Sequence, residues 1–421
     1  MTTVSFDPAV FDTPEYWRDP YPHLKVLRDH FPVYHDEMHG LWYITRYDDV
    51  CNAFKDNVHY SSKNLERSMA LVFGTTMMQF DGEEHTKRRN IVAPEFSGRR
   101  MDPLIPIIEK NTQDLVDRIT AQAAERLAQG FADKGEVELI DAFSSRLPVM
   151  VIIDMLGLPQ KDHDLFHEWY PAMMAGLTGT PEQRTYGIEC NQQFHAYIDK
   201  LVDERSVNPG EDLISKLCTA EVDGARMSKE DIKAFSSLLL VAGGETTDKA
   251  IGNMWVHMME NPDQFAEVKR DPELFDRVFT ETMRITPPAG SQQRDVIEPV
   301  ELYGQTIPVG AEAHFSIFAA NHDERVFDHP DDFDIFRNDL YFGRELRSGY
   351  FEGGRAGHLG FGLGKHFCVG YQLARSEAVI GSKALLQAMG NPRVKAGGAA
   401  HIQVAGPMNE QPRLDLEFEV V

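Results

Sequence analysis

The sequence predicts a mainly α-helical fold with small β-sheets, and three observations support this prediction. Apolar residues recur at steps of four over 115–127, which places them on one face of an amphipathic helix. The stretch 228–260 is long, largely apolar in its centre, and ends before an Asn-Pro pair, which is typical of a long buried helix. Short strand-like runs surround glycines in 33–47 and 300–309.

Each predicted element has local start and stop signals. Ser228 with Asp231 resembles a capping box at the start of the long helix, and Asn261-Pro262 ends it. At 1.5 Å per residue this helix is on the order of 50 Å long. In chain order, the other predicted elements are two strands around His39-Gly40 within 33–47, helices at 147–156 and 272–285, strands at 300–302 and 306–309, a long irregular coil from 321 to about 357, and a last helix from Cys368 to about Met389.

The composition excludes several classes of protein. Among 421 residues there are 42 Lys and Arg against 66 Asp and Glu, and the net charge of −24 argues against nucleic-acid binding, which needs basic residues. Four cysteines without a C-x-x-C spacing are too few for a disulfide framework, which favours a reducing compartment. No run approaches the roughly 18 apolar residues of a membrane helix. We therefore expect a cytoplasmic protein without a signal peptide or membrane anchor.

The strongest local signal is the glycine-rich stretch 358–370, which contains Cys368. Its glycines let the backbone turn through positive φ or pass close to a bulky group. A thiolate where this loop opens a helix is stabilised by the helix dipole, and Lys365 and His366 act in the same direction. The loop alone leaves open an iron–thiolate site, an inert buried cysteine, and a zinc site with His358 and His366 that lacks a fourth ligand.

The centre of the long helix, 242–247, combines two glycines with Glu245 and Thr246. Two glycines inside a helix cost about 2 kcal/mol relative to alanine, so we expect a neighbouring group to approach the backbone there. An acid beside a hydroxyl suits a short proton relay in a dry pocket. A threonine hydroxyl can also bond to a helix carbonyl and open the helix locally, and an ordinary polar patch is the alternative reading.

Four motifs follow one another along the chain: His85-x-x-x-Arg89, Ala242-Gly243-Gly244-Glu245-Thr246, Glu281-x-x-Arg284 and Phe361-x-x-Gly364-x-x-x-Cys368-x-Gly370. Over roughly residues 15–421 the sequence resembles the cytochrome P450 family, in its soluble bacterial form. The length alone suggests two or three average domains or one large domain, and the resemblance implies a single haem-thiolate catalytic domain over 1–421. Haem b is expected to lie buried between the helix 228–260 and the loop 358–370, after a β-containing N-terminal part at about 30–60.

The resemblance also implies how the haem is held. Cys368 is expected to be the thiolate ligand of the iron, which favours cleavage of the O–O bond, and Phe361 to shield its sulfur from water. Gly362 and Gly370 belong to the glycines expected to let amide groups point at the sulfur. The buried propionates need cations, and the family positions for these are His85, Arg89, Arg294 and His366.

By the same resemblance, Glu245 and Thr246 are the catalytic pair that delivers protons to O2. The implied enzyme is a monooxygenase that inserts one oxygen atom from O2 into a small, mostly apolar organic substrate, by hydroxylation or oxidative dealkylation. Electrons are expected from a ferredoxin- or flavodoxin-like donor with its reductase, since no flavin or iron–sulfur motif is present. The alternatives are a peroxide-driven or non-oxygenating haem-thiolate enzyme, which Glu245-Thr246 argues against, and a haem-based binding or sensor protein.

Two surfaces follow from sequence position. The segment 344–365 carries four basic and two acidic residues, which suits docking of an acidic electron donor, with chance clustering as the alternative. The stretches 65–80, 169–177 and 289–293 are expected to wall the substrate pocket, although plain core is an equal reading for each of their methionines and aromatics.

Glu281 and Arg284 are three residues apart and share one helix face. An exposed pair would be worth well under 1 kcal/mol, whereas the resemblance implies a buried, structural pair completed by a third basic residue. Asp332 stands where many members have arginine. Either Arg337 or His329 substitutes, or the triad is incomplete.

Overall fold

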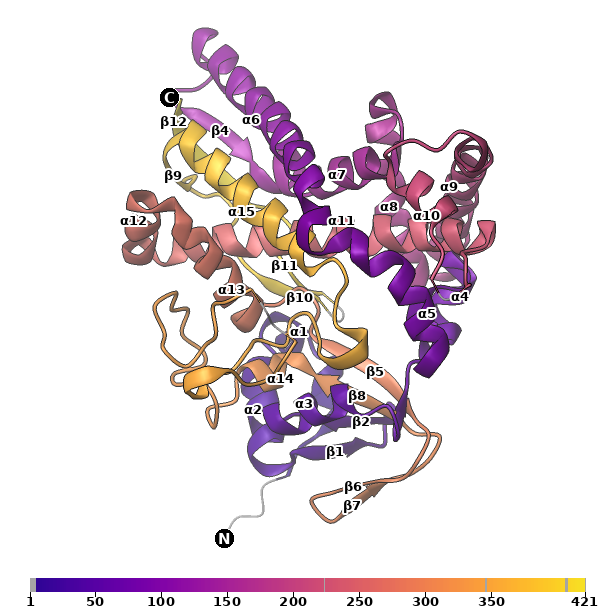
Figure 1. The fold of residues 1–421 in the computed structure, drawn as a ribbon. Coiled ribbons are helices and arrows are strands. Elements are labelled where there is room, and N and C mark those ends of the chain that lie inside the picture. Colours follow the sequence, from indigo (N-terminus) through magenta and orange to yellow (C-terminus); the bar gives the residue numbers. More distant parts are fainter. Residues whose placement is uncertain (1–4, 223, 345–346, 406–407, 421) are drawn as a thin grey trace. The chain divides into compact units, whose positions relative to one another are not determined.

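The computed structural model describes residues 5–222, 224–344, 347–405 and 408–420 (Figure 1). The chain is mainly helical with small sheets, as predicted. It divides into two compact units, and each is described by itself. The first comprises Met1–Asn64, Gly252–Cys368 and Ala400–Leu414, and the second Leu65–Ile251, Val369–Ala399 and Asp415–Val421. Within the described ranges, every helix is too short or too polar to cross a lipid bilayer.

The first unit is built on a five-stranded sheet in the order β1-β2-β8-β5-β3. Its strands are Val33–Asp36 (β1), Leu41–Ile44 (β2), Tyr60–Ser61 (β3), Ser291–Val296 (β5) and Glu312–Ser316 (β8). β2 and β8 pair in parallel, and the other neighbours are antiparallel. Gly40 turns the chain between β1 and β2 at a φ of 72°. The predicted strand pair in 33–47 is therefore confirmed.

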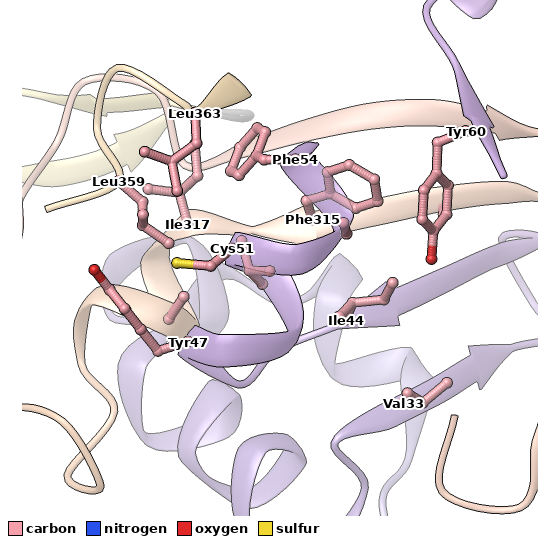
Figure 2. Packing of buried hydrophobic residues seen from close by; sticks show 14 of the residues in the cluster. Val33, Ile44, Tyr47, Cys51, Phe54, Tyr60, Phe315, Ile317, Leu359 and Leu363 are labelled. Atoms are coloured by element: carbon pink, nitrogen blue, oxygen red, sulfur yellow. The ribbon is translucent and has the colours of Figure 1, made fainter. Parts of the chain in front are cut away.

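An apolar core joins this sheet to the helix α3 (Tyr47–Lys55), as Figure 2 shows. The rings of Phe54 and Tyr60 meet Phe315 edge-on, at centroid distances of 5.5 and 4.9 Å. Leu359 and Leu363, from the glycine-rich loop, are buried in the same core. Burying such a side chain is worth roughly 1.5–3 kcal/mol, so the loop is anchored at two points. The remaining elements of this unit are α1 (Pro14–Arg18), α2 (Tyr21–His30), α12 (Pro262–Arg270), α13 (Phe275–Ile285), α14 (Ile317–Asn321) and the hairpins β6 (Val300–Leu302)–β7 (Gln305–Ile307) and β10 (Gln403–Ala405)–β11 (Met408–Glu410).

Arg284 of α13 forms the expected buried pair with Glu281. Its Nε and Nη2 donate to Oε2 and Oε1 of Glu281 at 2.9 and 2.7 Å, and both side chains are fully buried. Arg337 completes the triad, with Nη1 3.5 Å from Glu281 Oε1. Asp332 contributes its backbone carbonyl, which accepts from Arg284 Nη2 at 3.0 Å. The triad is therefore complete although position 332 is acidic, because its second cation comes from five residues further along the coil.

The long coil that the sequence predicts follows α14, and its segment 340–357 is tied back to the first unit. Tyr341 N–H donates to the carbonyl of Ala356 at 2.8 Å, so the two ends of the segment meet. The rings of Tyr341 and Phe351 stack at 3.7 Å. The hydroxyl of Tyr47 in α3 lies 2.7 Å from the carbonyl oxygen of Gly349. These contacts fix the described ends of the segment, which also contains a short 3-10 helix at Glu352–Gly354.

The second unit is mainly helical and contains a three-stranded sheet in the order β4-β12-β9. A Cβ on Gly187 in α9 would lie 2.6 Å from the carbonyl oxygen of Ala172 in α8, so a glycine is needed where these two helices touch. Its elements are α4 (Asn64–Phe73), α5 (Gly82–Val92), α6 (Ile105–Ala128), β4 (Gly135–Glu138), a π-helical turn (Ile140–Ser144), α7 (Leu147–Leu156), α8 (His163–Thr178), α9 (Pro181–Val207), α10 (Leu213–Thr219), α11 (Lys229–Glu260, as far as Ile251), α15 (Tyr371–Ala388), β9 (Met389–Val394) and β12 (Asp415–Val420).

The predicted helices are present, and two start later than expected. The helix predicted at 272–285 begins at Phe275, after a 3-10 turn at Pro272–Leu274. α7 spans the predicted 147–156. At the start of α11, Asp231 N–H donates to Ser228 Oγ at 3.1 Å and Ser228 N–H donates to Asp231 Oδ2 at 3.0 Å, which is the expected reciprocal cap. α15 begins at Tyr371, three residues after Cys368, because Gly370 is its N-cap. Cys368 therefore precedes the helix instead of opening it.

Candidate active site

The glycine-rich loop of the first unit ends at Cys368, a partly buried cysteine that forms no disulfide. Its own backbone closes it: Cys368 N–H donates to the carbonyl of Phe361 at 3.0 Å, and Gly362 N–H to that of Leu359 at 2.8 Å. The ring of Phe361 stacks on Phe279 of α13 at 6.1 Å. The loop is thus held by its own hydrogen bonds and by a helix that carries the buried triad.

Two loop glycines are required by conformation, and one of them also by space. Gly362 and Gly364 have φ values of 66° and 69°, a region that other residues enter at a cost of about 1–2 kcal/mol. A Cβ on Gly364 would lie 2.6 Å from the carbonyl oxygen of Phe54, whereas the nearest atom to a Cβ on Gly362 is 3.5 Å away. Positive φ and close backbone approach were both expected of this loop, and both occur.

Two predicted cation positions of the first unit share one polar neighbourhood at the β3–β5 edge of the sheet. Arg294 in β5 is buried and donates from Nη1 to the carbonyl of Gln293 at 2.7 Å. Asn64 donates to the same carbonyl at 3.1 Å. His366 Nε2 lies 3.2 Å from the hydroxyl of Ser62. The stretch 62–64 therefore connects Arg294 with His366.

The other two predicted cations, His85 and Arg89, lie in the second unit. They are four residues apart in α5, which places them on one helix face. His85 is buried and Arg89 half-buried. Arg88 between them is paired with carboxylates instead, donating to Glu84 at 2.8 Å and to Asp231. α5 therefore carries the predicted pair of His85 and Arg89 and, separately, Arg88 in its ion pairs with Glu84 and Asp231.

The centre of α11, in the second unit, lies against α7 and α8. A Cβ on Gly243 would be 2.8 Å from Ile152 Cδ1, and one on Gly244 would be 3.3 Å from Val149 Cγ2 and 3.5 Å from the ring of Tyr170. The close approach expected at these two glycines is therefore made by side chains of α7 and α8.

Glu245 and Thr246 follow directly on the same helix. Thr246 Oγ1 donates to the carbonyl of Ala242 at 2.7 Å, and α11 remains helical through this point, so the hydroxyl does not open the helix. Ala242 is exposed and Thr246 partly exposed, which makes this side of an otherwise buried helix accessible. Glu245 Oε1 accepts from Lys249 Nζ at 2.9 Å. Its Oε2 is buried and has no hydrogen-bond partner among the described residues.

A second polar contact lies beside this pair. Asp248 Oδ1 accepts from the hydroxyl of Ser144 at 2.6 Å, and both side chains are buried. Burial raises the pKa of Tyr170 on α8, and the charges of Asp248 and Glu245 raise it further. The ring of His167 lies 5.7 Å from that of Tyr170, and burial lowers the pKa of this histidine. Glu245 therefore sits in a largely desolvated polar cluster.

The side chains of the candidate site suit a metal ion that is already held by a cofactor, and they do not suit a bare ion. No group of three or more His, Cys, Asp or Glu able to hold a bare ion occurs among the described residues. The zinc alternative with His358, His366 and Cys368 is therefore not formed. Haem b supplies four ring nitrogens to its iron and carries two carboxylates, so it suits a lone thiol together with partly or fully buried basic side chains.

The stretches expected to wall a substrate pocket mix core and accessible residues. Leu71 is exposed, and in β5 of the first unit Gln293 is exposed while Gln292 is partly buried. Among the methionine, valine and aromatic residues of the second unit's stretches, the buried ones are Met69, Val72, Phe73, Trp169, Tyr170 and Met173, and the partly buried ones are Met77, Met78, Phe80 and Met174.

Sequence reasoning missed Lys249 and the contact between Asp248 and Ser144. A signal for the first was present, because two charged residues follow the apolar centre of a helix and Lys249 is spaced four residues from Glu245. The second joins positions more than a hundred residues apart, for which the sequence carries no local signal.

A family model described as Cytochrome P450 matches residues 170–389. The chain is 33% identical over 385 residues to pulcherriminic acid synthase of Bacillus subtilis (strain 168), covering 90% of this chain and 91% of that protein. It is 31% identical over 383 residues to the cytochrome P450 monooxygenase PikC of Streptomyces venezuelae, covering 89% and 84% of the two chains.

Among solved structures, substrate-free CYP109E1 from Bacillus megaterium matches with a TM-score of 0.84 and 26% identity, covering 96% of this chain and 99% of that chain. The expected fold is thereby confirmed. The chain belongs to the cytochrome P450 family, and it is a haem-thiolate monooxygenase that uses haem b, O2 and an organic substrate.

Proposed function

We propose that Cys368 is the thiolate ligand of the haem iron and that the two compact units together form one catalytic domain over 1–421. The observation that carries this proposal is a single thiol at the end of a closed loop whose glycines adopt positive φ and, at Gly364, admit backbone contact. When bound, the haem supplies the iron at which O2 is reduced and its O–O bond broken, and a thiolate ligand favours that cleavage.

Phe361 shields the thiolate from water in this proposal, supported by its stacking on Phe279. Gly362 and Gly370 let backbone amide groups point at the sulfur of Cys368. The propionates are held by cations, because carboxylates buried in a protein of net charge −24 need local compensation. These cations are His85, Arg89, Arg294 and His366.

Glu245 and Thr246 act as the proton relay. Thr246 donates its hydroxyl hydrogen to Ala242, which leaves the lone pairs of Oγ1 to accept a hydrogen bond. Glu245 takes a proton from solvent and passes it on to Thr246 Oγ1. As Thr246 accepts it, its own hydroxyl hydrogen leaves the carbonyl of Ala242 and would be delivered into the pocket, so Thr246 stays a neutral hydroxyl. A positioned acid–base group of this kind typically contributes 10²–10⁴-fold to the rate.

The substrate is a small, mostly apolar organic molecule, which is hydroxylated or oxidatively dealkylated. Support comes from the methionine and aromatic side chains of 65–80 and 169–177, since such side chains form adaptable apolar walls. The four free cysteines support a cytoplasmic location.

Electrons come from a ferredoxin- or flavodoxin-like donor with its reductase. The basic residues of 344–365 are all exposed, which suits electrostatic docking of an acidic partner. They are Arg344, Arg347, Arg355 and Lys365. Of the two acids in that segment, Glu352 is exposed, whereas Glu345 lies outside the described residues.

The assignment of Cys368 is tested optically. The reduced CO complex should show the strongly red-shifted Soret band of thiolate ligation, and Cys368→Ser should abolish it. Cys190→Ser, which changes another free buried cysteine, is the control and should keep the band. An unshifted band in the natural protein, or a red-shifted band that survives in Cys368→Ser, would overturn the assignment.

The relay is tested by measuring how much product is formed for each electron consumed. Thr246→Ala should consume electrons without a matching yield of product, because protons no longer reach the reduced oxygen in a controlled way. An unchanged product yield per electron would remove Thr246 from the relay.

A further inference from the structure

A buried amide side chain joins the glycine-rich loop to α13, and the proposed roles of the site residues do not account for it. Asn321, the last residue of α14, is fully buried. Its Oδ1 accepts a hydrogen bond from the backbone N–H of Leu359 at 2.9 Å, and its Nδ2 donates to the carbonyl of Met283 at 3.3 Å. Leu359 belongs to the loop and Met283 to α13, so one side chain bridges the two segments.

The two partners fix the orientation of this amide. A backbone N–H can only donate and a backbone carbonyl can only accept, so the amide oxygen faces Leu359 and the amide nitrogen faces Met283. The backbone carbonyl of Asn321 in turn accepts from Arg284 Nη1 at 3.1 Å. Asn321 is therefore held through its main chain by the buried pair of Arg284 and Glu281, and it holds the loop through its side chain.

The loop backbone also contacts α13 at the next residue. A Cβ on Gly360 would lie 2.8 Å from the carbonyl oxygen of Met283, the same oxygen that accepts from Asn321. A glycine is required there, because the opposing atom belongs to the backbone and cannot move by a change of rotamer. The bridge through Asn321 and this contact occur at neighbouring loop residues, so together they fix the start of the loop against α13.

Hydrogen bonds within the loop extend this fixed position towards the cysteine. The carbonyl of Leu359 accepts from the N–H of Gly362 at 2.8 Å, and the carbonyl of Phe361 accepts from the N–H of Cys368 at 3.0 Å. If Leu359 lost its acceptor, its N–H would be a buried donor without a partner, which is costly. Loop conformations that expose this group to water would then become more populated.

We propose that Asn321 is a positioning residue for the cysteine: by holding the N–H of Leu359 beside α13, it keeps the loop in the conformation in which the Cys368 sulfur can bind the haem iron. The inference rests on the proposed role of Cys368 as the ligand. It differs from a purely structural role, because it requires that loss of the bridge changes the loop and the iron ligation, and not stability alone.

Asn191 in α9 provides the matched control. It is 5% exposed, its Nδ2 donates to the carbonyl of Val72 at 2.5 Å, and its Oδ1 accepts from the hydroxyl of Ser237 at 2.6 Å. Like Asn321, it is a buried asparagine that donates to a backbone carbonyl and accepts one hydrogen bond. Its partners lie outside the loop, so Asn191→Leu removes an equivalent pair of bonds without touching the bridge.

The first test reads the loop amides directly and makes no assumption about the iron ligand. Hydrogen exchange of the resting haem-loaded protein is followed by mass spectrometry on a peptide that covers 358–362, since exchange reports local opening. A buried donor without a partner disfavours the closed loop by roughly tenfold. Exchange of this peptide should therefore be about tenfold faster in Asn321→Leu than in the natural protein, and within about twofold of it in Asn191→Leu.

The second test reads ligation. In the reduced CO complex, the ratio of unshifted to red-shifted Soret absorbance should rise about tenfold in Asn321→Leu and stay within about twofold in Asn191→Leu. Asn321→Asp keeps an oxygen that can accept from Leu359, so its ratio should stay closer to that of the natural protein. Urea unfolding of both leucine variants measures how far the ratio follows stability. Asn321→Ala takes the place of Asn321→Leu if the latter binds no haem.

The outcomes separate this inference from the assignment of the ligand. Faster exchange and a raised ratio in Asn321→Leu alone support it. If Cys368→Ser abolishes the red-shifted band while the ratio in Asn321→Leu stays natural, or changes equally in Asn191→Leu, the role of Asn321 is overturned and the ligand assignment stands. If the red-shifted band survives in Cys368→Ser, the ligand assignment fails, and the role of Asn321 in ligation fails with it.

Discussion

Replacing Gly364 with alanine tests whether close backbone contact fixes the cysteine loop. The added Cβ would lie 2.6 Å from the carbonyl oxygen of Phe54 and 3.3 Å from Lys55 Cα, whereas ordinary contact begins at about 3.4 Å. Both opposing atoms belong to the backbone of α3. Relief therefore requires the loop or the helix to shift, and a change of side-chain rotamer does not provide it.

The magnitude has two parts. A φ of 69° costs alanine about 1–2 kcal/mol, and forcing a group into a close-packed site costs about 1–3 kcal/mol. Gly364→Ala should therefore destabilise the protein by about 2–5 kcal/mol. Gly362→Ala is the matched control, because its φ of 66° is nearly the same while the nearest atom lies 3.5 Å away. It should lose about 1–2 kcal/mol.

The assay is urea unfolding of the haem-loaded proteins followed by far-UV circular dichroism, with haem absorbance per protein as a measure of loop integrity. Gly364→Ala should unfold at a lower urea concentration than Gly362→Ala and retain less haem. The two variants share the backbone conformation and differ in the space around the new methyl group. Equal midpoints and equal haem content would therefore refute the argument from backbone contact.

Three further predictions follow from the buried groups. Arg337→Ala should cost about 3–5 kcal/mol in urea unfolding, because it strips one of two cations from buried Glu281; a loss under 1 kcal/mol would show that Arg284 suffices. Burial lowers the pKa of His257 to about 3, so its contribution to stability is complete above the unfolded pKa of about 6.5 and is lost at up to about 1.4 kcal/mol per unit as the pH falls towards 3. In His257→Gln, the urea midpoint should therefore depend less on pH between pH 6.5 and 5 than in the natural protein. An equal dependence on pH in both proteins would contradict this. Gly243→Ala gains about 1 kcal/mol of helix propensity but places a methyl 2.8 Å from Ile152 Cδ1. Adding Ile152→Val removes that atom, so thermal unfolding should show the double variant more stable than the two single changes predict, and strict additivity would argue against the clash.

Much of the fold follows from local signals in the sequence. The ends of α7 and α11 are marked by residues within or next to each helix, such as Ser228 and Asp231 at the start of α11. The strand order of the five-stranded sheet does not follow from local signals. β2 pairs in parallel with β8, about 270 residues away in sequence, and Ile44 lies opposite Phe315. No local pattern encodes that pairing, which depends on the packed core of the first unit.

The candidate site likewise contains residues that could be identified from the sequence and residues that could not. Residues of one loop or one helix turn form short motifs, whose neighbours in sequence are also neighbours in space, and the resemblance to the family assigns their roles. The third member of the Glu281 triad could not, because choosing Arg337 over His329 requires the path of the coil. Lys249 was missed because a lysine four residues from a glutamate is usually a surface pair, and only burial distinguishes it.

The closed segment 340–357 has a consequence for protein engineering. Because the backbones of Tyr341 and Ala356 meet, the residues between them form a loop whose ends are fixed independently of its length. Closing a flexible loop twice as long costs only about 0.6 kcal/mol more. The exposed pair Gly353-Gly354 is therefore a suitable insertion point. The guanidinium of Arg347, in the same loop, lies 5.9 Å from the ring of Phe367 beside the cysteine. A redox module fused at this point would be tethered next to the cysteine loop, and electron delivery would change from a collision between two proteins to an event within one chain.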